Sequence, residues 1–277
     1  MTTAPAPALA WMDGAIVPQA EATVPLADDG VLRGDAVFEA MLVRAGRTHA
    51  RALHLDRLRR SAAALEIPLP SATILRCLAD LLAAYDGHDG SLRVIVTRGG
   101  VVRGLIGPVS WPASLALAVV EMPWRTALSG VKTLSYAANQ WAVRQARARG
   151  GDDALVVDAG QVLELPTGAV VLVHGGRCST PDPARLPILD SVTLRVLREV
   201  VDVTPSIPTD AELRSAEEVL VVSATRPGLP VHRLLLADGT TRELPAPGPV
   251  TAAIRARLEA HVTATLDTVP AVPAEAD

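Results

Sequence analysis

Cysteine and a surplus of basic charge are both lacking in this sequence. Its two cysteines, Cys77 and Cys178, are too few for a disulfide framework. The 26 basic residues are outnumbered by 30 acidic ones, which gives a net charge of −4, so nucleic acid is not an expected partner. No apolar run approaches the roughly 20 residues that span a bilayer, and residues 1–10 lack the pattern of a secretory signal. The composition predicts a cytoplasmic globular protein that binds neither nucleic acid nor membranes.

Several sequence motifs that identify common enzyme classes are also absent. The chain contains no G-x-S-x-G elbow, no Walker loop and no G-x-G-x-x-G after a predicted strand. The six histidines are scattered, with no pair at i and i+4 and no cysteine at ligand spacing, so no metal site is expected. These absences argue against serine hydrolases, kinases, nicotinamide dehydrogenases and zinc enzymes.

Lysine is nearly missing, because 25 of the 26 basic residues are arginine and the remaining one is Lys132. A coding bias toward arginine explains why lysine is rare, but not why one lysine remains. Arginine cannot replace lysine where a deprotonated amine must act, because the guanidinium stays charged at any physiological pH. Lysine amines can lose their proton and form imines. Lys132 is therefore the first candidate for a chemical role.

The pattern of apolar residues predicts a mixed α+β fold with two lobes. The Asp-Gly pairs at 13–14 and 238–239 predict hairpins, and the segment 28–30 is expected to be a loop. Apolar residues at helical spacing predict helices over 53–65 and 71–85. Strands in hairpins are as frequent as strands in βαβ units, which favours an α+β class over a parallel barrel.

A change in composition suggests where the two lobes divide. We expect an N-terminal domain over residues 1–121, a linker over 122–130 that carries Pro123 and Gly130, and a C-terminal domain over 131–266. The last segment, 267–277, is rich in proline and alanine and is expected to be disordered.

The surroundings of Lys132 resemble the lysine segment of the class IV aminotransferases, which are pyridoxal phosphate (PLP) enzymes of fold type IV. Five further segments are similar to motifs of that family and occur in the same order. They are Gly34-Asp35-Ala36-Val37-Phe38-Glu39, His54-Leu55-Asp56-Arg57-Leu58, Val162-Leu163-Glu164-Leu165-Pro166-Thr167, Ile188-Leu189-Asp190-Ser191-Val192-Thr193, and a last segment from Ala216 to Val231. The resemblance covers roughly residues 10 to 235. It implies a fold like that of D-amino acid aminotransferase, with a small N-terminal α/β domain, a larger C-terminal domain and a homodimeric assembly.

The resemblance also implies how this chain would bind PLP. Lys132 would form the aldimine with the cofactor and move protons at the substrate carbon. Glu164 would face the pyridine nitrogen, and Arg57 would pair with the phosphate. The other implied cofactor contacts are the backbone at Val192, Thr193 and Ala224, the side chains of Thr193 and Thr225, and Tyr136 at the phenolic oxygen.

On the substrate side, the resemblance implies contacts from Phe38 and from the glycine-rich loop after residue 97. Arg98 and Arg103 of this loop would bind the carboxylate of an amine or amino acid substrate. Some positions differ from the family pattern: Leu165 and Ser191 replace glycines, Leu194 replaces an arginine, and Ala224 stands where a threonine hydroxyl commonly meets the phosphate. The stretch before Lys132 is also shorter than usual.

Three functions are consistent with these residues. The first is an aminodeoxychorismate lyase, which releases pyruvate and 4-aminobenzoate for folate synthesis; the arginine–glycine loop and the short chain are similar to those lyases. The second is transamination of D- or branched-chain amino acids, with the same lysine. The third is a non-catalytic relative with weak cofactor binding, suggested by the altered phosphate turn and the shortened segment.

Overall fold

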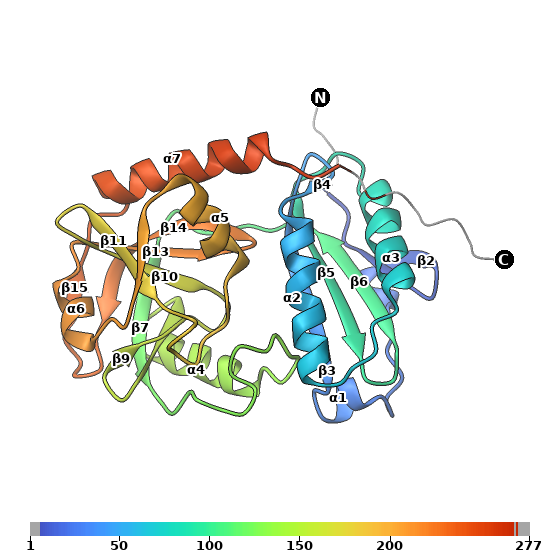
Figure 1. Ribbon diagram of the computed structural model, residues 1–277, viewed down its shortest axis with the longest axis horizontal. Coiled ribbons are helices and arrows are strands. Elements are labelled where there is room, and N and C mark those ends of the chain that lie inside the picture. The colour runs from blue at the N-terminus through green and yellow to red at the C-terminus, as the bar shows by residue number, and fades with distance from the viewer. Residues whose placement is uncertain (1–5, 269, 271–277) are drawn as a thin grey trace. The chain divides into compact units, whose positions relative to one another are not determined.

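The computed structural model of the protein describes residues 6–268 and residue 270. The chain divides into two units, each with its own sheet and core. Unit 1 is formed by residues 1–110, 131–135 and 262–277, as far as these are described, and unit 2 by residues 111–130 and 136–261. The predicted α+β class is confirmed, because both units combine helices with strands (Figure 1).

Unit 1 is built on a six-stranded antiparallel sheet in the order β2-β1-β6-β5-β3-β4. Its strands are β1 (Leu9–Met12), β2 (Ala15–Pro18), β3 (Ala36–Arg44), β4 (Arg47–Thr48), β5 (Gly90–Thr97) and β6 (Val102–Gly107). Its helical segments are η1 (Gln19–Glu21), α1 (Asp29–Leu32), α2 (Arg51–Ala64) and α3 (Ser71–Ala84). Helices α2 and α3 share one apolar core with the sheet.

Local sequence explains the main elements of unit 1. The predicted first hairpin is confirmed: Asp13 and Gly14 both have positive φ, the conformation that a tight two-residue hairpin turn requires. Helix α3 buries Ile74, Leu78 and Leu81, which are three or four residues apart and therefore lie on one face. The segment 28–30 is not the loop that we predicted. The Asp28 side chain accepts a hydrogen bond from the Gly30 N–H and caps the short helix α1.

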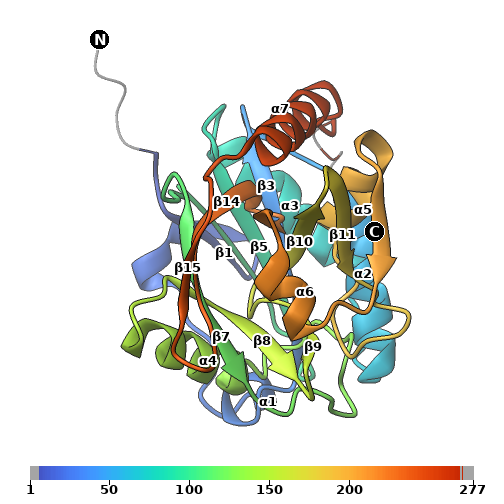
Figure 2. The same cartoon turned by 90° about the vertical axis from the view of Figure 1, so that its left-hand side faces the viewer.

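Unit 2 contains a nine-stranded mixed sheet, in which β12-β11-β10-β13-β14-β7-β8-β9 lie in this order and β15 pairs with β14. The strands are β7 (Leu115–Glu121), β8 (Asp153–Asp158), β9 (Gln161–Val162), β10 (Ala169–His174), β11 (Arg177–Pro181), β12 (Val203–Ser206), β13 (Glu218–Ser223), β14 (Arg226–Leu235) and β15 (Thr241–Glu243). The helices are α4 (Ala137–Ala148), α5 (Val192–Val200), α6 (Asp210–Ser215) and α7 (Pro249–Ala264), the last of which continues into unit 1. Helix α4 packs against β7 and β8 (Figure 2).

The boundaries of the two units differ from the expected domains at two places. Residues 115–121 fall in the expected N-terminal domain, but they form β7, which pairs in parallel with β8 and β14 of unit 2. We expected Lys132 in the C-terminal domain, but residues 131–135 belong to unit 1, where Thr133 forms a bridge with Val37 of β3. Both differences arise from backbone pairing between segments that are distant in sequence.

Two further expectations concern the C-terminal tail and membrane-spanning segments. Asp267, the first residue of the expected disordered tail, is held by a hydrogen bond from its N–H to the Thr48 carbonyl, at 2.8 Å. Residues 269 and 271–277 of that tail lie outside the described part of the chain. No helix in the described part is long and apolar enough to cross a membrane.

Candidate functional site

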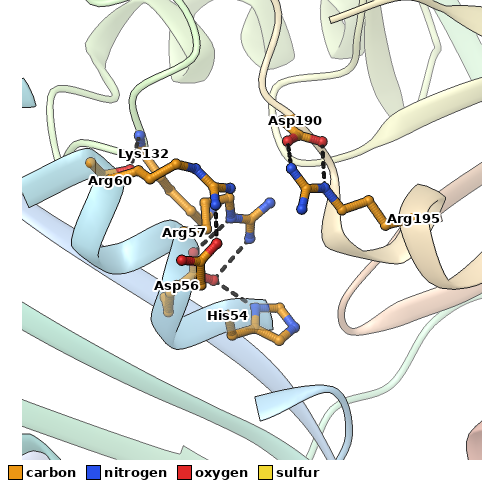
Figure 3. A network of polar contacts seen from close by, with 9 residues as sticks. His54, Asp56, Arg57, Arg60, Lys132, Asp190 and Arg195 are labelled. Carbon is orange, nitrogen blue, oxygen red and sulfur yellow. Dashed lines mark hydrogen bonds and ion pairs between the residues drawn. The ribbon is translucent and has the colours of Figure 1, made fainter. Parts of the chain in front are cut away.

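A buried cluster of three polar side chains lies between β3 and α2 in unit 1. Glu39 is fully buried, and both of its carboxylate oxygens accept from Arg57, with Nε–Oε1 at 2.7 Å and Nη2–Oε2 at 2.8 Å. The Nδ1 atom of His54 lies 2.7 Å from Glu39 Oε2. Figure 3 shows His54 and Arg57 side by side on α2, with dashed lines to the carboxylate that they share. A bidentate arginine–carboxylate pair has a fixed geometry, so Glu39 sets the direction of the Arg57 guanidinium.

The same contacts determine the charge of the cluster. Burial would raise the pKa of Glu39, but the hydrogen bonds and positive charge of Arg57, helped by His54, outweigh it and lower the pKa to about 2. Burial lowers the pKa of His54; its bond to Glu39 opposes this shift, and the charges of Arg57 and Lys132 add to it. Glu39 is therefore ionised and His54 is neutral at neutral pH.

The segment that carries Lys132 is fixed to unit 1 through its backbone. The Lys132 N–H donates to Ser61 Oγ of α2 at 3.0 Å, and the Lys132 carbonyl accepts from the Phe38 N–H at 3.3 Å. One residue pair further on, the Leu134 N–H donates to the Ala36 carbonyl at 2.9 Å. The lysine segment thus pairs with β3. Lys132 is hydrogen-bonded to Phe38, which directly precedes Glu39, the partner of Arg57.

The Lys132 amine and a guanidinium both lie over the ring of Phe38. The distance to the ring centroid is 4.4 Å from Lys132 Nζ and 4.9 Å from Arg93 Cζ. Phe38 and Glu39 are neighbours on β3 and point to opposite faces of the sheet, so the ring faces away from α2. Arg93 is exposed, and within residues 6–268 and 270 its side chain has no hydrogen bond or ion pair. Arg93 was not recognised as a site residue from the sequence, because no motif surrounds it.

The two arginines that we expected on the substrate side are both engaged elsewhere in unit 1. Arg98 forms an ion pair with Asp35 and donates to the Leu65 carbonyl at 2.6 Å. Arg103 is buried and binds both oxygens of Asp13, at 2.9 and 3.1 Å. The structure therefore places both side chains as anchors of the loop and of the first hairpin. To bind a substrate carboxylate, either would have to exchange a partner.

Glu164 of unit 2 lies just after β9 and accepts two hydrogen bonds. Its Oε1 receives the indole N–H of Trp124 at 3.0 Å, and its Oε2 receives the Leu189 N–H at 3.1 Å. Hydrogen bonds to a carboxylate favour its ionised form, so this geometry suits a residue that must stay negative beside a protonated ring nitrogen. Trp124 was not recognised from the sequence, since only the fold brings it beside a residue 40 positions away.

The predicted anion site at the start of α5 has the local geometry that such a site needs. Ser191 is the N-cap, and its hydroxyl accepts from the Leu194 N–H at 3.3 Å. The first N–H groups of a helix have no acceptor within the helix, so those of Val192 and Thr193 point out at its positive end. Asp190 is tied to Arg195 one turn later, with Nε–Oδ1 at 3.0 Å (Figure 3), so its charge is offset.

The other predicted contacts of unit 2 lie at turns and helix ends. Ala224 and Thr225 form the turn between β13 and β14, and the Thr225 carbonyl accepts from the indole N–H of Trp111 at 2.8 Å. Tyr136 is half-buried at the N-cap position of α4. Its contact with a cofactor remains a prediction.

The predicted site residues are thus divided between the two units. Unit 1 holds Lys132 in contact with Phe38, and it also holds Arg57, Arg98 and Arg103. Unit 2 holds Glu164, Tyr136, Val192, Thr193, Ala224 and Thr225. Among the described residues, no three metal-ligating side chains form a group that could hold a metal ion.

Comparison with known proteins gives a consistent result. A family model described as amino-transferase class IV matches residues 36–234. A bifunctional aminodeoxychorismate lyase / D-amino acid transaminase of Mycobacterium tuberculosis is 29% identical over 272 residues, which cover 84% of this chain and 92% of that protein. A D-alanine aminotransferase of Listeria innocua is 27% identical over 267 residues, 86% of this chain and 90% of that protein.

Among solved structures, similarity extends over nearly the whole chain. The PLP-bound form of a hypothetical aminotransferase from Mycobacterium tuberculosis superposes with a TM-score of 0.82 at 27% identity, and covers 92% of this chain and 99% of that one. A fold IV transaminase from Curtobacterium pusillum gives a TM-score of 0.80 at 28% identity, over 93% and 99% of the two chains.

Proposed function

The chain belongs to the class IV aminotransferase family, and we propose that it is a PLP enzyme of the aminodeoxychorismate lyase type, releasing pyruvate and 4-aminobenzoate. One observation carries the proposal. The single lysine of the chain holds its amine 4.4 Å from the Phe38 ring centroid, on a segment fixed to β3 and to α2, which carries Arg57. The name of the Mycobacterium tuberculosis relative, at 29% identity, supports the lyase reaction.

The residues present fit the cofactor chemically. A lysine amine, an arginine held by a buried glutamate, and two outward N–H groups at a helix start match the aldehyde and phosphate of PLP. A carboxylate with two hydrogen-bond donors matches a protonated pyridine nitrogen. We propose cofactor roles for Lys132 and Arg57 of unit 1, and for Glu164, Thr193 and the turn at 224–225 of unit 2.

When bound, PLP supplies an electron sink for negative charge that develops at the substrate carbon. Lys132 removes the proton from the amine-bearing carbon and later returns it. Glu164, fixed by Trp124 and by the Leu189 N–H, keeps a negative charge at its position. Arg57 and the start of α5 offset the charge of a phosphate.

Arg93 is the arginine of unit 1 that is best placed to bind the carboxylate of the substrate. It shares the Phe38 ring with Lys132, and it is exposed, whereas Arg98 and Arg103 are paired with aspartates. A guanidinium can bind a carboxylate through two parallel hydrogen bonds, which would orient the substrate relative to the lysine amine. Aminodeoxychorismate and amino acids both carry such a carboxylate.

A second candidate is transamination of D-amino acids, which is favoured by the names of the relatives from Mycobacterium tuberculosis and Listeria innocua. The first proton transfer by Lys132 is common to both reactions. The two differ in their later steps: the lyase releases an enolpyruvyl group, whereas the transaminase passes the amine to a keto acid.

Two assays on the purified holoenzyme separate the candidates. Aminodeoxychorismate should yield 4-aminobenzoate and pyruvate, measured by fluorescence and by a coupled dehydrogenase. D-alanine with 2-oxoglutarate should yield pyruvate only if the enzyme transaminates. Formation of 4-aminobenzoate without keto-acid exchange supports the lyase, and the reverse supports the transaminase. If neither reaction occurs and borohydride leaves the absorbance of the PLP-treated protein unchanged, the proposal of a PLP enzyme is wrong.

We also propose a cytoplasmic homodimer. The exposed large apolar side chains of unit 1 are concentrated in one short stretch, where Leu26 is 79% and Leu32 is 57% exposed. Exposed apolar groups that cluster in this way are typical of a protein contact surface. Both cysteines are free thiols, as is usual in a reducing compartment. Light scattering during gel filtration tests the assembly. A monomeric mass would contradict the proposed homodimer.

A further inference from the structure

Arg226 connects three segments of unit 2 from a buried position. It is the first residue of β14, is 2% exposed, and its Nη1 lies 2.9 Å from Oδ2 of Asp153 at the start of β8. Its Nε donates to Ser223 Oγ at 3.3 Å, and its Nη2 donates to Oγ1 of Thr167. One side chain thus joins segments that are up to 73 residues apart in the sequence.

Two of these partners flank residues with a proposed cofactor role. Ser223 immediately precedes the turn at Ala224 and Thr225. Thr167 belongs to the tight turn after Glu164, in which the Leu165 N–H donates to the Gly168 carbonyl at 2.9 Å. The Arg226 guanidinium therefore ties the proposed phosphate turn to the segment of the carboxylate that serves the pyridine nitrogen.

Trp111 holds the same turn from a second direction. Its indole N–H donates to the Thr225 carbonyl at 2.8 Å, and its ring centroid lies 4.7 Å from the Arg226 Cζ atom. Ala224 has no side-chain hydroxyl, so residues 224 and 225 can offer a phosphate only backbone N–H groups and the Thr225 hydroxyl. The direction of backbone N–H groups depends on how the turn is held, and Arg226 and Trp111 hold it.

Stability alone does not account for this ion pair. Removing two charges from water is costly, and an apolar pair of similar volume is often as stabilising. What an apolar pair cannot supply is the set of directed hydrogen bonds to Ser223, Thr167 and Asp153. The arrangement therefore favours a role in positioning.

We infer that Arg226 is a positioning residue for the phosphate turn, residues 223–225: anchored on Asp153 and Thr167, it sets the direction in which this turn meets the cofactor phosphate. The inference rests on the proposed function, because it presumes that the protein binds PLP. It predicts that Arg226 matters for ligands that carry the phosphate and not for the same ring without it.

The test compares the affinities of two ligands, PLP and pyridoxal, which lacks the phosphate. Arg226→Met should raise the Kd of PLP about tenfold, the equivalent of one well-made hydrogen bond, and leave the Kd of pyridoxal unchanged. Arg226→Lys keeps the charge but loses the forked guanidinium. Its PLP Kd should lie between those of wild type and Arg226→Met. The matched control is Arg233→Met, on the same strand, where the arginine has an exposed partner, Glu243. Its PLP Kd should equal that of wild type.

The double variant Asp153→Leu/Arg226→Met removes both charges of the ion pair. It replaces the single variant in the test if Arg226→Met does not fold. Its apoprotein should unfold near the wild-type urea midpoint and still bind PLP more weakly. Equal changes in the PLP and pyridoxal affinities, or a wild-type PLP affinity in the folded double variant, would overturn the inference alone. A wild-type protein that took up no PLP would overturn the proposed function and this inference with it.

Discussion

The Nζ atom of Lys132 lies 4.4 Å from the centroid of the Phe38 ring, so the amine of the only lysine is placed against an aromatic face. A cation is attracted to such a face, and the contact restricts the orientation of a long flexible side chain. The ring therefore defines where the amine acts.

Replacement of this amine should abolish the chemistry. Lys132→Ala is expected to lose turnover and the imine absorbance together, because no other lysine is present. Lys132→Arg is the matched control for charge, and it should also be inactive, since a guanidinium does not give up its proton. Absorbance spectra and single-turnover assays measure both effects. An alanine variant with wild-type rates and no added amine would contradict the assignment.

Arg93 should control substrate binding. Arg93→Met is expected to raise KM about 10- to 100-fold with a smaller change in kcat, because a charged hydrogen bond to the substrate carboxylate is lost. The control is Arg44→Met, at the far end of β3, whose arginine pairs with Asp89. Initial rates over a range of substrate concentrations measure the effect. A larger rise in KM for Arg98→Met than for Arg93→Met would restore Arg98 as the substrate residue.

Glu39 should stabilise unit 1 and hold Arg57 for the cofactor. Glu39→Gln removes the counter-charge of a buried arginine, which typically costs about 3–5 kcal/mol of unfolding free energy. The exposed Glu243→Gln, which breaks the pair with Arg233, should change stability very little. Urea denaturation gives the stability, and dialysis followed by absorbance gives the PLP retained. Unchanged retention in a folded Glu39→Gln protein would argue against a phosphate role for Arg57.

His54 should make stability depend on pH. Burial lowers its pKa from 6.5, so the unfolded chain takes up a proton at a higher pH than the folded one. Its contribution is fully present above that ordinary pKa and is lost as the pH falls below it. His54→Gln should therefore show a flatter Tm between about pH 7 and pH 5 than wild type, measured by calorimetry of the apoprotein. Parallel Tm curves for the two proteins would contradict this.

Glu164 should matter for rate more than for stability. Glu164→Gln keeps the shape of the side chain but not its charge, and it is expected to lower kcat about 100-fold, in the range seen when one electrostatic contact is removed from an active site. Trp124→Phe, which removes the indole donor to Glu164, should have a smaller effect in the same direction. Stopped-flow measurement of the proton-transfer step tests both variants. Wild-type kcat in Glu164→Gln would exclude the proposed role.

Local elements were predictable from the sequence because their signals are local. The first hairpin is indicated by Asp13-Gly14, and α2 and α3 are indicated by apolar spacing. The class of fold and the family were indicated by short motifs in a fixed order. In contrast, the residues of β7 were assigned to the N-terminal domain, since the pairing of β7 with β8 and β14 depends on residues far along the chain.

The same distinction applies to the site. Arg57 stood out within H-x-x-R-L, but nothing local indicates that Glu39, 18 residues earlier, binds it. Glu39 ends the family-like segment 34–39 and His54 begins the segment 54–58, so both could have been given a role on that ground. Arg93 lies outside the family-like segments, and Arg226 lies within the last of them but was given no role. Only tertiary contacts reveal the surroundings of both.

Helix α2 carries His54, Arg57 and Ser61 on one face, three and four residues apart, and Ser61 accepts from the backbone of Lys132. Each residue of an α-helix advances by about 100°, so one inserted or deleted residue between His54 and Ser61 would rotate part of this set away from the rest. Such a helix could still fold, because Arg59, Arg60 and Ala63 on its outer side are exposed and do not pack in the core. Changes of loop length can thus be tolerated elsewhere in unit 1. The number of residues between His54 and Ser61 is fixed, because these side chains must share one face of α2.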